Sequence, residues 1–453
     1  MGCGPVSGSN SAPASEPAGF SRLHPLTPLV RGWALLVAGA IAVGQQLVRG
    51  ELDIVGLAVT GGAVMAVGVA AGAVSWWFTR FRIDATELRI ESGVFVRRSR
   101  RIPLERLQAV DVVQPLVGRL LRLAEVRLEV AGGARSEAAL AYLPLAEAHR
   151  VRRVLLPASA GARTESAAPG SPGFAAPAPV LVRTTPLLLL AGQLLSSQFL
   201  LAVLGFATVD AVLFLAGRFP GLPFLAAELA ALGALVVRPF VAEYGFTVSD
   251  APGGLRIQRG LLDLRSSTVL PGRVQGVAVF EPVLWRLMRW VRVEVDVAGQ
   301  AESADDSSGD AAATLVPIGS RSVADAAVGE VLPGVVVPAI RATPAPQRAR
   351  WVSPLGWRYL AAGADDRAVL TRAGWLVRRT DVVPHAKIQS IRVRQGPWQR
   401  RLGLADVLID SPPGPVTAKA KHRPAQSARV FAFTQLARAQ LARERARTIG
   451  PGA

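Results

Sequence analysis

The sequence predicts a multi-domain membrane protein in which two transmembrane helical hairpins precede the first two of three mainly-β units. A motif occurs three times, at Gln108, Gln275 and Gln389: a basic residue, an aliphatic residue, the glutamine, and then β-branched residues at alternate positions. Two pairs of long apolar runs stand ahead of the first two copies, and each copy ends in a segment with helical spacing. A repeat of this kind defines the organisation of the chain.

Composition places the chain among membrane proteins. Of its 453 residues 50% are apolar, and the mean hydropathy of +0.33 is high for a soluble protein. The net charge of +18 is carried almost wholly by arginine, which suits cytoplasmic loops and anionic lipid headgroups. The single cysteine excludes an intrachain disulfide, and with four scattered histidines it builds no Cys/His metal site. We therefore expect no metal and no cofactor.

Residues 25–79 are predicted to form the first hairpin, after a disordered tail at 1–24. The first apolar run starts near Leu29, and the second, Leu52 to Phe78, has no charged residue after Asp53. The second run ends in aromatic residues typical of a membrane surface. About 25 successive residues without a polar face span a membrane more readily than they fit the core of a small domain.

Residues 183–242 are predicted to form the second hairpin. Arg183 and Arg238 flank its inner end, so the N-terminus and all three β units are predicted to be cytoplasmic in a multi-pass protein of the cell membrane. Glu228 lies inside the descending run, where a carboxylate is by default a functional candidate. The alternative is that Glu228 reaches water at the outer face or pairs with Arg218.

Short alternating segments punctuated by glycine predict β-strands with one wet face in each unit. Every unit closes with a predicted helix, at Leu145–Leu155, Ser320–Val331 and Pro424–Arg447. Pro-rich and Ala-rich segments are expected to link the units. The β units are placed at residues 80–157, 243–335 and 351–447, with linkers at 158–182 and 336–350.

Recurring glycines and glutamines are expected to be structural. Each glutamine amide is expected to satisfy backbone groups where the sheet bends. The residues in this set are Gly93, Gln108, Gly260, Gln275, Gly374 and Gln389. Trp285, Trp290 and Trp398 are expected to pack in a domain core or to face the membrane.

With this domain order and motif, the chain resembles the membrane-flanked bacterial PH-like (pleckstrin-homology-like) domain proteins of the YdbT type. The resemblance extends from about Leu29 to Arg447. It implies that each unit is a PH-like domain, a bent sheet or barrel of about seven strands closed by one C-terminal helix. The segment from Ser411 to Pro415 departs from the other copies, so the three copies are not expected to share one unchanged binding surface.

No catalytic motif is present, and we predict that the protein is not an enzyme. Clustered basic side chains are instead predicted to bind anionic headgroups or partner proteins, because arginine forks bind phosphate bidentately. The alternative is that they cover the wet face of a strand or only fix the topology. The candidates are Arg97, Arg98, Arg100, Arg101, Arg106, Arg273, Arg378, Arg379 and Lys387.

Two functions follow from the sequence. In the first, the protein is a membrane scaffold whose cytoplasmic domains bind anionic lipids, partner proteins or a second copy, in maintenance of the envelope. In the second, four spans form a transport or export path that the domains regulate. The scarcity of ionisable residues within the spans argues against transport. No nucleic acid is expected, because aromatic and basic residues do not interleave along a strand.

Overall fold

The computed structural model describes most of the chain after residue 179 and parts of what precedes it. The described residues are 21, 22, 62, 66, 77, 80–83, 87–92, 98–103, 107–130, 137–148, 150, 151 and 179–448, without 219, 220, 252, 253, 299–312 and 413. The first predicted hairpin, at 25–79, lies almost wholly outside them. We refer to residues 80–157, 243–335 and 351–447 as the first, second and third repeats.

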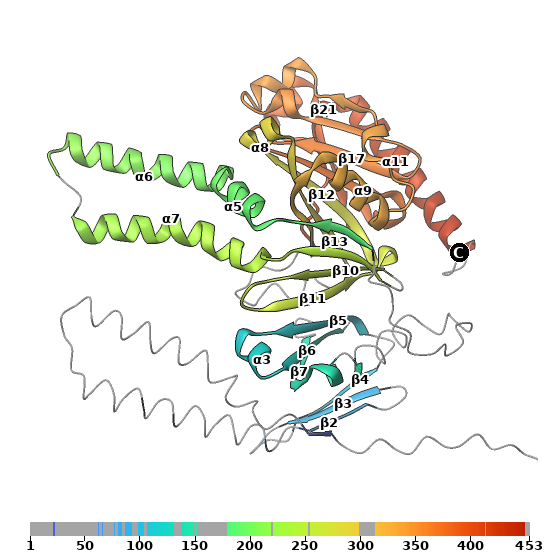
Figure 1. Ribbon diagram of the computed structural model, residues 1–453. Coiled ribbons are helices and arrows are strands. Elements are labelled where there is room, and N and C mark those ends of the chain that lie inside the picture. The colour runs from blue at the N-terminus through green and yellow to red at the C-terminus, as the bar shows by residue number, and fades with distance from the viewer. Residues whose placement is uncertain are drawn as a thin grey trace, which may run out of the picture.

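Each repeat contains strands that continue into a closing helix (Figure 1). The first has β2 (Arg80–Ile83), β3 (Glu87–Ser92), β4 (Arg98–Pro103), β5 (Leu107–Gln114), α3 (Leu116–Leu120), β6 (Leu123–Val130) and β7 (Glu137–Pro144). The second has β9 (Thr247–Ala251), β10 (Gly254–Arg259), β11 (Leu264–Val269), η2 (Pro271–Arg273), β12 (Val274–Pro282), α8 (Val283–Met288), β13 (Trp290–Val297), β14 (Ala313–Ser320) and α9 (Arg321–Val331).

The third repeat follows the same order and ends in the longest of its helices. Its elements are η6 (Trp357–Tyr359), β16 (Ala361–Ala364), β17 (Ala368–Ala373), β18 (Val377–Pro384), η7 (His385–Lys387), β19 (Ser390–Arg394), α10 (Pro397–Leu402), β20 (Leu404–Asp410), β21 (Lys419–Pro424) and α11 (Ala425–Thr448). Helices α9 and α11 begin within one residue of their predicted starts. Residues 145–148, 150 and 151 are helical, inside the first predicted closing helix.

A short strand stands ahead of every repeat and pairs with it. These strands are β1 (Ser21–Arg22), β8 (Val180–Arg183) and β15 (Ala342–Pro344), which pair with β2, β9 and β16 respectively. Strand β8 begins inside the segment expected to be a linker, and the second hairpin runs between β8 and β9. That hairpin is therefore inserted into the fold after the first strand. It does not precede the fold.

The described strands form four sheets, two of which cross from one repeat to the next. One seven-stranded sheet has the order β7-β6-β5-β11-β10-β9-β8, and the other has β14-β13-β12-β18-β17-β16-β15. Both crossings, β5 with β11 and β12 with β18, are antiparallel. Figure 1 shows the sheets following one another through the molecule. The repeats are thus joined by backbone hydrogen bonds between their strands, in addition to side-chain contacts.

The β12–β18 crossing is the better covered of the two. Strand β12 is buried along almost its whole length, and Val277 and Val382, paired directly across the junction, are both fully buried. Burying an aliphatic side chain of this size contributes about 1.5–3 kcal/mol. The main core continues from these valines to α9, whose Ala324, Ala327 and Val328 pack beneath the sheet.

The second hairpin is built from three helices. Helix α5 (Pro186–Leu194) ends before Ser196, whose hydroxyl accepts a hydrogen bond from the Phe199 amide and caps α6 (Ser197–Leu215). Helix α7 (Leu222–Glu243) returns. Only α6 and α7 are long and apolar enough to cross a membrane, among the residues described, and they project from one side of the molecule (Figure 1). The ascending segment was expected to be one helix from residue 187; the cap at Ser196 divides it.

Candidate functional site

The base of the hairpin is fixed to the second repeat. Leu189 of α5 packs with Trp285 of α8 and Ile318 of β14, and all three side chains are buried. The Trp285 indole donates a 3.1 Å hydrogen bond to the Gly192 carbonyl. A Cβ at Gly192 would lie 2.4 Å from the Cδ1 atom of Ile318, so a larger residue there would require the Ile318 side chain to move. This face of the second repeat, which carries α8, is therefore held next to the base of the hairpin formed by α6 and α7.

The third repeat has a short loop where the second has its hairpin. Strand β15 ends at Pro344 and β16 starts at Ala361, and the chain between them forms η5 (Gln347–Trp351) and η6 in place of spanning helices. Ala349 and Leu360 bury themselves against Leu404, which anchors the loop. Trp351 at its outer end remains 71% exposed and Leu355 remains 68% exposed. Large apolar side chains thus emerge at the topological position of the hairpin.

Direct contacts connect this loop to the base of the hairpin. The guanidinium of Arg286 in α8 donates a 2.8 Å hydrogen bond to the Trp375 carbonyl, in the turn between β17 and β18. The same guanidinium lies 5.4 Å from the centre of the Tyr359 ring in η6. Trp357, also in η6, and Leu402 at the end of α10 both pack against the buried cluster that contains Leu360 and Leu404. Helix α8, the turn and η6 are therefore joined by direct contacts, and η6 and α10 pack on the same buried cluster.

Exposed apolar side chains and arginines alternate on the surface of these elements and of the loop, which we call the Trp–Arg face. Arginines lie over three of its tryptophan rings, Arg350 on Trp351 at 5.2 Å, Arg358 on Trp357 at 5.5 Å and Arg401 on Trp398 at 5.3 Å. Isolated exposed apolar residues are ordinary, but a contiguous set indicates a contact surface. The apolar members of the face are Leu287, Met288, Trp351, Leu355, Trp375 and Trp398, all of them exposed.

The cations predicted for binding lie mostly at the junction between the second and third repeats, where Arg378 also lies 5.8 Å from the centre of the Tyr359 ring in η6. Arg378 pairs with Glu281 at 3.2 Å, and Arg379 pairs with Asp381 at 2.8 Å. The Lys387 ammonium donates to the Gly272 carbonyl at 2.8 Å, and burial lowers its pKa. These side chains already have partners within the protein, so headgroup binding by them stays a prediction.

The remaining predicted cations are less fully described. Arg273 ends η2 and has an interaction partner within the protein. Arg98, Arg100 and Arg101 lie on β4, where the Arg101 side chain is exposed. Arg97 and Arg106 lie outside the described residues. Helix α8 was not predicted as part of a site, although its exposed Leu287 and Met288 beside Arg289 would have been the signal.

The structural role expected of the motif glycines and glutamines stays a prediction, and the structure places several of them in turns and bends. Gly260 and Gly374 have φ of +112° and +91°, and a Cβ on either would lie 2.0 Å from a backbone oxygen across the turn. The Gln275 amide donates to the Arg273 carbonyl at 3.1 Å, as expected of a bend. Gln389 is exposed. Gly93 and the side chain of Gln108 lie outside the described part.

Glu228 of α7 is buried, and its neighbouring acidic group is Asp210 of α6. A second acid beside Glu228 was not expected. The sequence favoured contact with water or with Arg218. The pair lies between the two helices of the hairpin, near its tip. Among the residues that the structure describes, no group of three His, Cys, Asp or Glu side chains could hold a metal ion.

The fold and the hairpin define a membrane protein built from bacterial PH domains. The model of the family described as "Bacterial PH domain" matches residues 34–159 and 313–439, more than half of the chain, and the chain belongs to that family. It is YdbT-like: over 261 residues it is 24% identical to "UPF0699 transmembrane protein YdbT" of Bacillus subtilis (strain 168). The match covers 51% of this chain and 52% of the relative, so the chain spans about half the length of the curated relative it matches.

Proposed function

We propose that this protein is a non-enzymatic, multi-pass membrane scaffold. Its three repeats are PH-like domains on the cytoplasmic side, and the Trp–Arg face lies against the bilayer and binds anionic lipid headgroups. Envelope maintenance is the process that we assign to it. The observation that carries the proposal is the loop with Trp351 and Leu355, which takes the place of a membrane hairpin in the third repeat.

The chemistry of the face supports this assignment. Tryptophan prefers the headgroup level of a membrane, where its ring is half apolar and its N–H reaches water. Each arginine near an anionic leaflet contributes about 1 kcal/mol. The flanking residues Arg183 and Arg238 at the inner end of the hairpin support a cytoplasmic position. We assign the Asp210–Glu228 pair to joining α6 and α7, and not to a transport path.

The proposal predicts a lipid preference that depends on arginines of the Trp–Arg face. Full-length protein in nanodiscs should show stronger tryptophan quenching by brominated phosphatidylglycerol than by brominated phosphatidylcholine. Changing Arg350 and Arg401 to Gln should weaken that preference about fivefold per arginine, from about 1 kcal/mol each. The matched control changes Arg445 and Arg447, at the far end of α11, to Gln.

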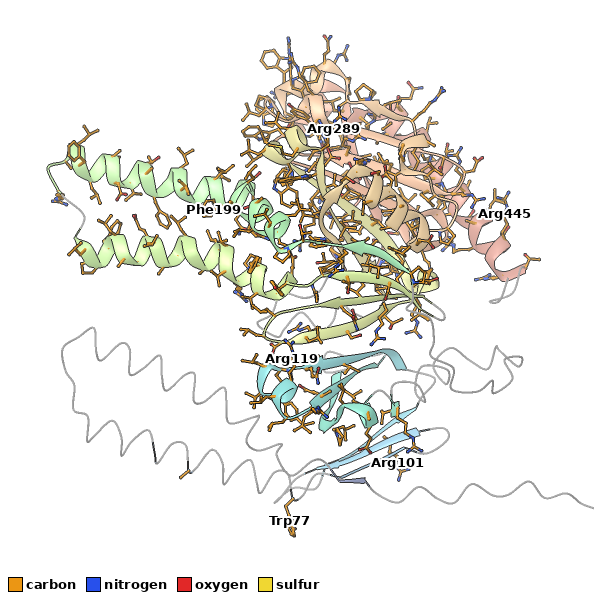
Figure 2. All side chains as sticks on the ribbon, viewed as in Figure 1. Trp77, Arg101, Arg119, Phe199, Arg289 and Arg445 are labelled. Carbon is orange, nitrogen blue, oxygen red and sulfur yellow. The ribbon has the colours of Figure 1, made fainter. Side chains whose placement is uncertain are left out.

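Figure 2 places Arg445 on the opposite side of the molecule from the hairpin helices, so the control pair should leave the preference unchanged. Equal quenching by the two brominated lipids in the wild-type protein would contradict headgroup binding. An equal loss of the lipid preference in the control variant would show that the preference comes from the net charge of the protein and not from the Trp–Arg face.

A further inference from the structure

Strand β19 of the third repeat corresponds to a strand that, in each of the first two repeats, pairs with a strand of the following repeat. The fourth strand of the first repeat, β5, is paired by β11, and that of the second, β12, is paired by β18. Strand β19 occupies the same position after the repeated glutamine. Among the described residues it pairs with β20 alone and forms the edge of a three-stranded sheet.

Exposure separates this edge from its counterparts. Val279 of β12 and Val393 of β19 both lie four residues after the repeated glutamine. Val279 is 3% exposed beneath its partner strand, whereas Val393 is 41% exposed. An edge strand of this kind presents N–H and C=O groups that another extended chain can pair. The preceding crossings are antiparallel, so an added strand is expected to run antiparallel to β19.

The arginines of β19 indicate which side chains an added strand would need. Arg392 and Arg394 replace Ala278 and Phe280 of β12 at the equivalent positions. Arg392 is bound by Asp410, at 2.7 Å. Arg394 is exposed and makes no ion pair with the residues that the structure describes.

The acid opposite Arg394 on β20, Asp406, is held instead by its own neighbours. It accepts hydrogen bonds from the Gln399 amide and the His422 backbone. Arg400 and Arg401 of α10 add further exposed positive charge near this edge.

A second copy of this chain does not fit the edge. The strand of the first repeat that is equivalent to β18 is β4. Among the described residues, β4 is an edge strand of its sheet, so it is the strand of a second copy that could pair with β19. Strands β4 and β18 can be aligned at their last residues, Pro103 and Pro384. If β19 pairs with β4 in the register that β12 has with β18, Arg392 lies opposite Arg100, and Arg394 lies opposite Arg98. Like charges directly opposite one another destabilise a strand pair.

We propose that β19 is the docking edge for an extended segment of a partner protein that carries acidic side chains at alternate positions. The segment adds antiparallel to β19, covers Val393 with an aliphatic residue and places a carboxylate opposite Arg394. The proposal is separate from lipid binding by the Trp–Arg face, and either can hold without the other.

Fluorescence anisotropy of a labelled nine-residue peptide of alternating valine and glutamate tests this on the full-length protein in detergent. We expect it to bind about tenfold more tightly than the same peptide with lysine for glutamate, because glutamate opposite Arg394 attracts and lysine there repels. N-methylation of alternate backbone nitrogens in the glutamate peptide should abolish binding, because strand pairing needs those N–H groups.

Arg394→Glu should reverse the order of the two peptides, and it leaves the Arg392–Asp410 pair in place. Arg447→Glu, with the same change of charge on α11, should not reverse it. Two results would overturn the proposal. One is failure of the wild-type protein to bind the glutamate peptide. The arginines would then serve to prevent strand pairing at this edge. The other is concentration-dependent oligomers that Arg394→Glu strengthens by placing Glu opposite Arg98, which would make a second copy the occupant.

Discussion

Glu281→Gln is expected to open the junction between the second and third repeats, with a loss of about 3 kcal/mol. The Glu281 carboxylate is 7% exposed. One of its oxygens is paired with Arg321 of α9 and the other with Arg378 of β18, at 3.2 Å. The neutral amide leaves the Arg378 guanidinium without a counter-charge, whereas Arg321 keeps its ion pair with Asp325 at 3.3 Å. Both arginine side chains are about one-third exposed. Because water can partly solvate them, the expected loss of stability lies at the lower end of the range for a broken buried ion pair.

Hydrogen exchange followed by mass spectrometry measures this effect where it should occur. A loss of about 3 kcal/mol corresponds to roughly hundredfold faster exchange of the β12 and β18 amides. The matched control is Asp410→Asn, which breaks the exposed pair with Arg392 and should cost no more than about 1 kcal/mol. Unchanged protection of both strands in Glu281→Gln would show that the carboxylate does not hold the repeats together.

Asp296→Asn is expected to remove a pH dependence of stability between about pH 4 and pH 7. Asp296 of β13 is 1% exposed, its Oδ2 has no polar partner among the residues described, and Gly414 lies against its carboxyl group. Burial raises the pKa of Asp296 from 3.8 to about 7. As the pH rises through this range, the unfolded chain releases the proton before the folded protein does. Stability therefore falls with rising pH, by up to about 4 kcal/mol.

Urea midpoints followed by tryptophan fluorescence at pH 4 and pH 8 test the sign. The Asn variant should be more stable than the wild type at pH 8 and lose that advantage at pH 4. Asp410→Asn provides the opposite case, because the hydrogen bond from Arg392 lowers the pKa of Asp410. That variant should lose stability at pH 8 and little at acid pH. Parallel pH curves for wild type and Asp296→Asn would contradict the account.

Local pattern was enough to predict much of the second and third repeats. The run after Gln275 is strand β12, and the helical spacing of Ser320–Val331 and Pro424–Arg447 became α9 and α11. The resemblance to YdbT-type proteins is confirmed by the family and by the relative. These features depend on side chains close together in the sequence, where periodicity is visible.

The features that the sequence did not predict depend on strand pairing between residues far apart in the chain. Strand β8 has only four residues, and its partner β9 follows after the whole hairpin, so its short run looked like the end of a linker. The pairing of β12 with β18 leaves no local signal. The Arg379-Thr380-Asp381 pattern was visible, since residues two apart share a face of a strand, and it could have indicated an internal ion pair.

Depth in the bilayer tests most directly whether the Trp–Arg face meets the membrane. Cys3 is the only cysteine, so Cys3→Ser provides a background for a single fluorophore at Leu355→Cys or, as control, at Arg445→Cys. In proteoliposomes with nitroxide-headgroup lipids, we predict strong quenching of the label at 355 and little at 445, which lies on the opposite side of the molecule from the hairpin helices (Figure 2). Equal quenching at the two positions would contradict the account.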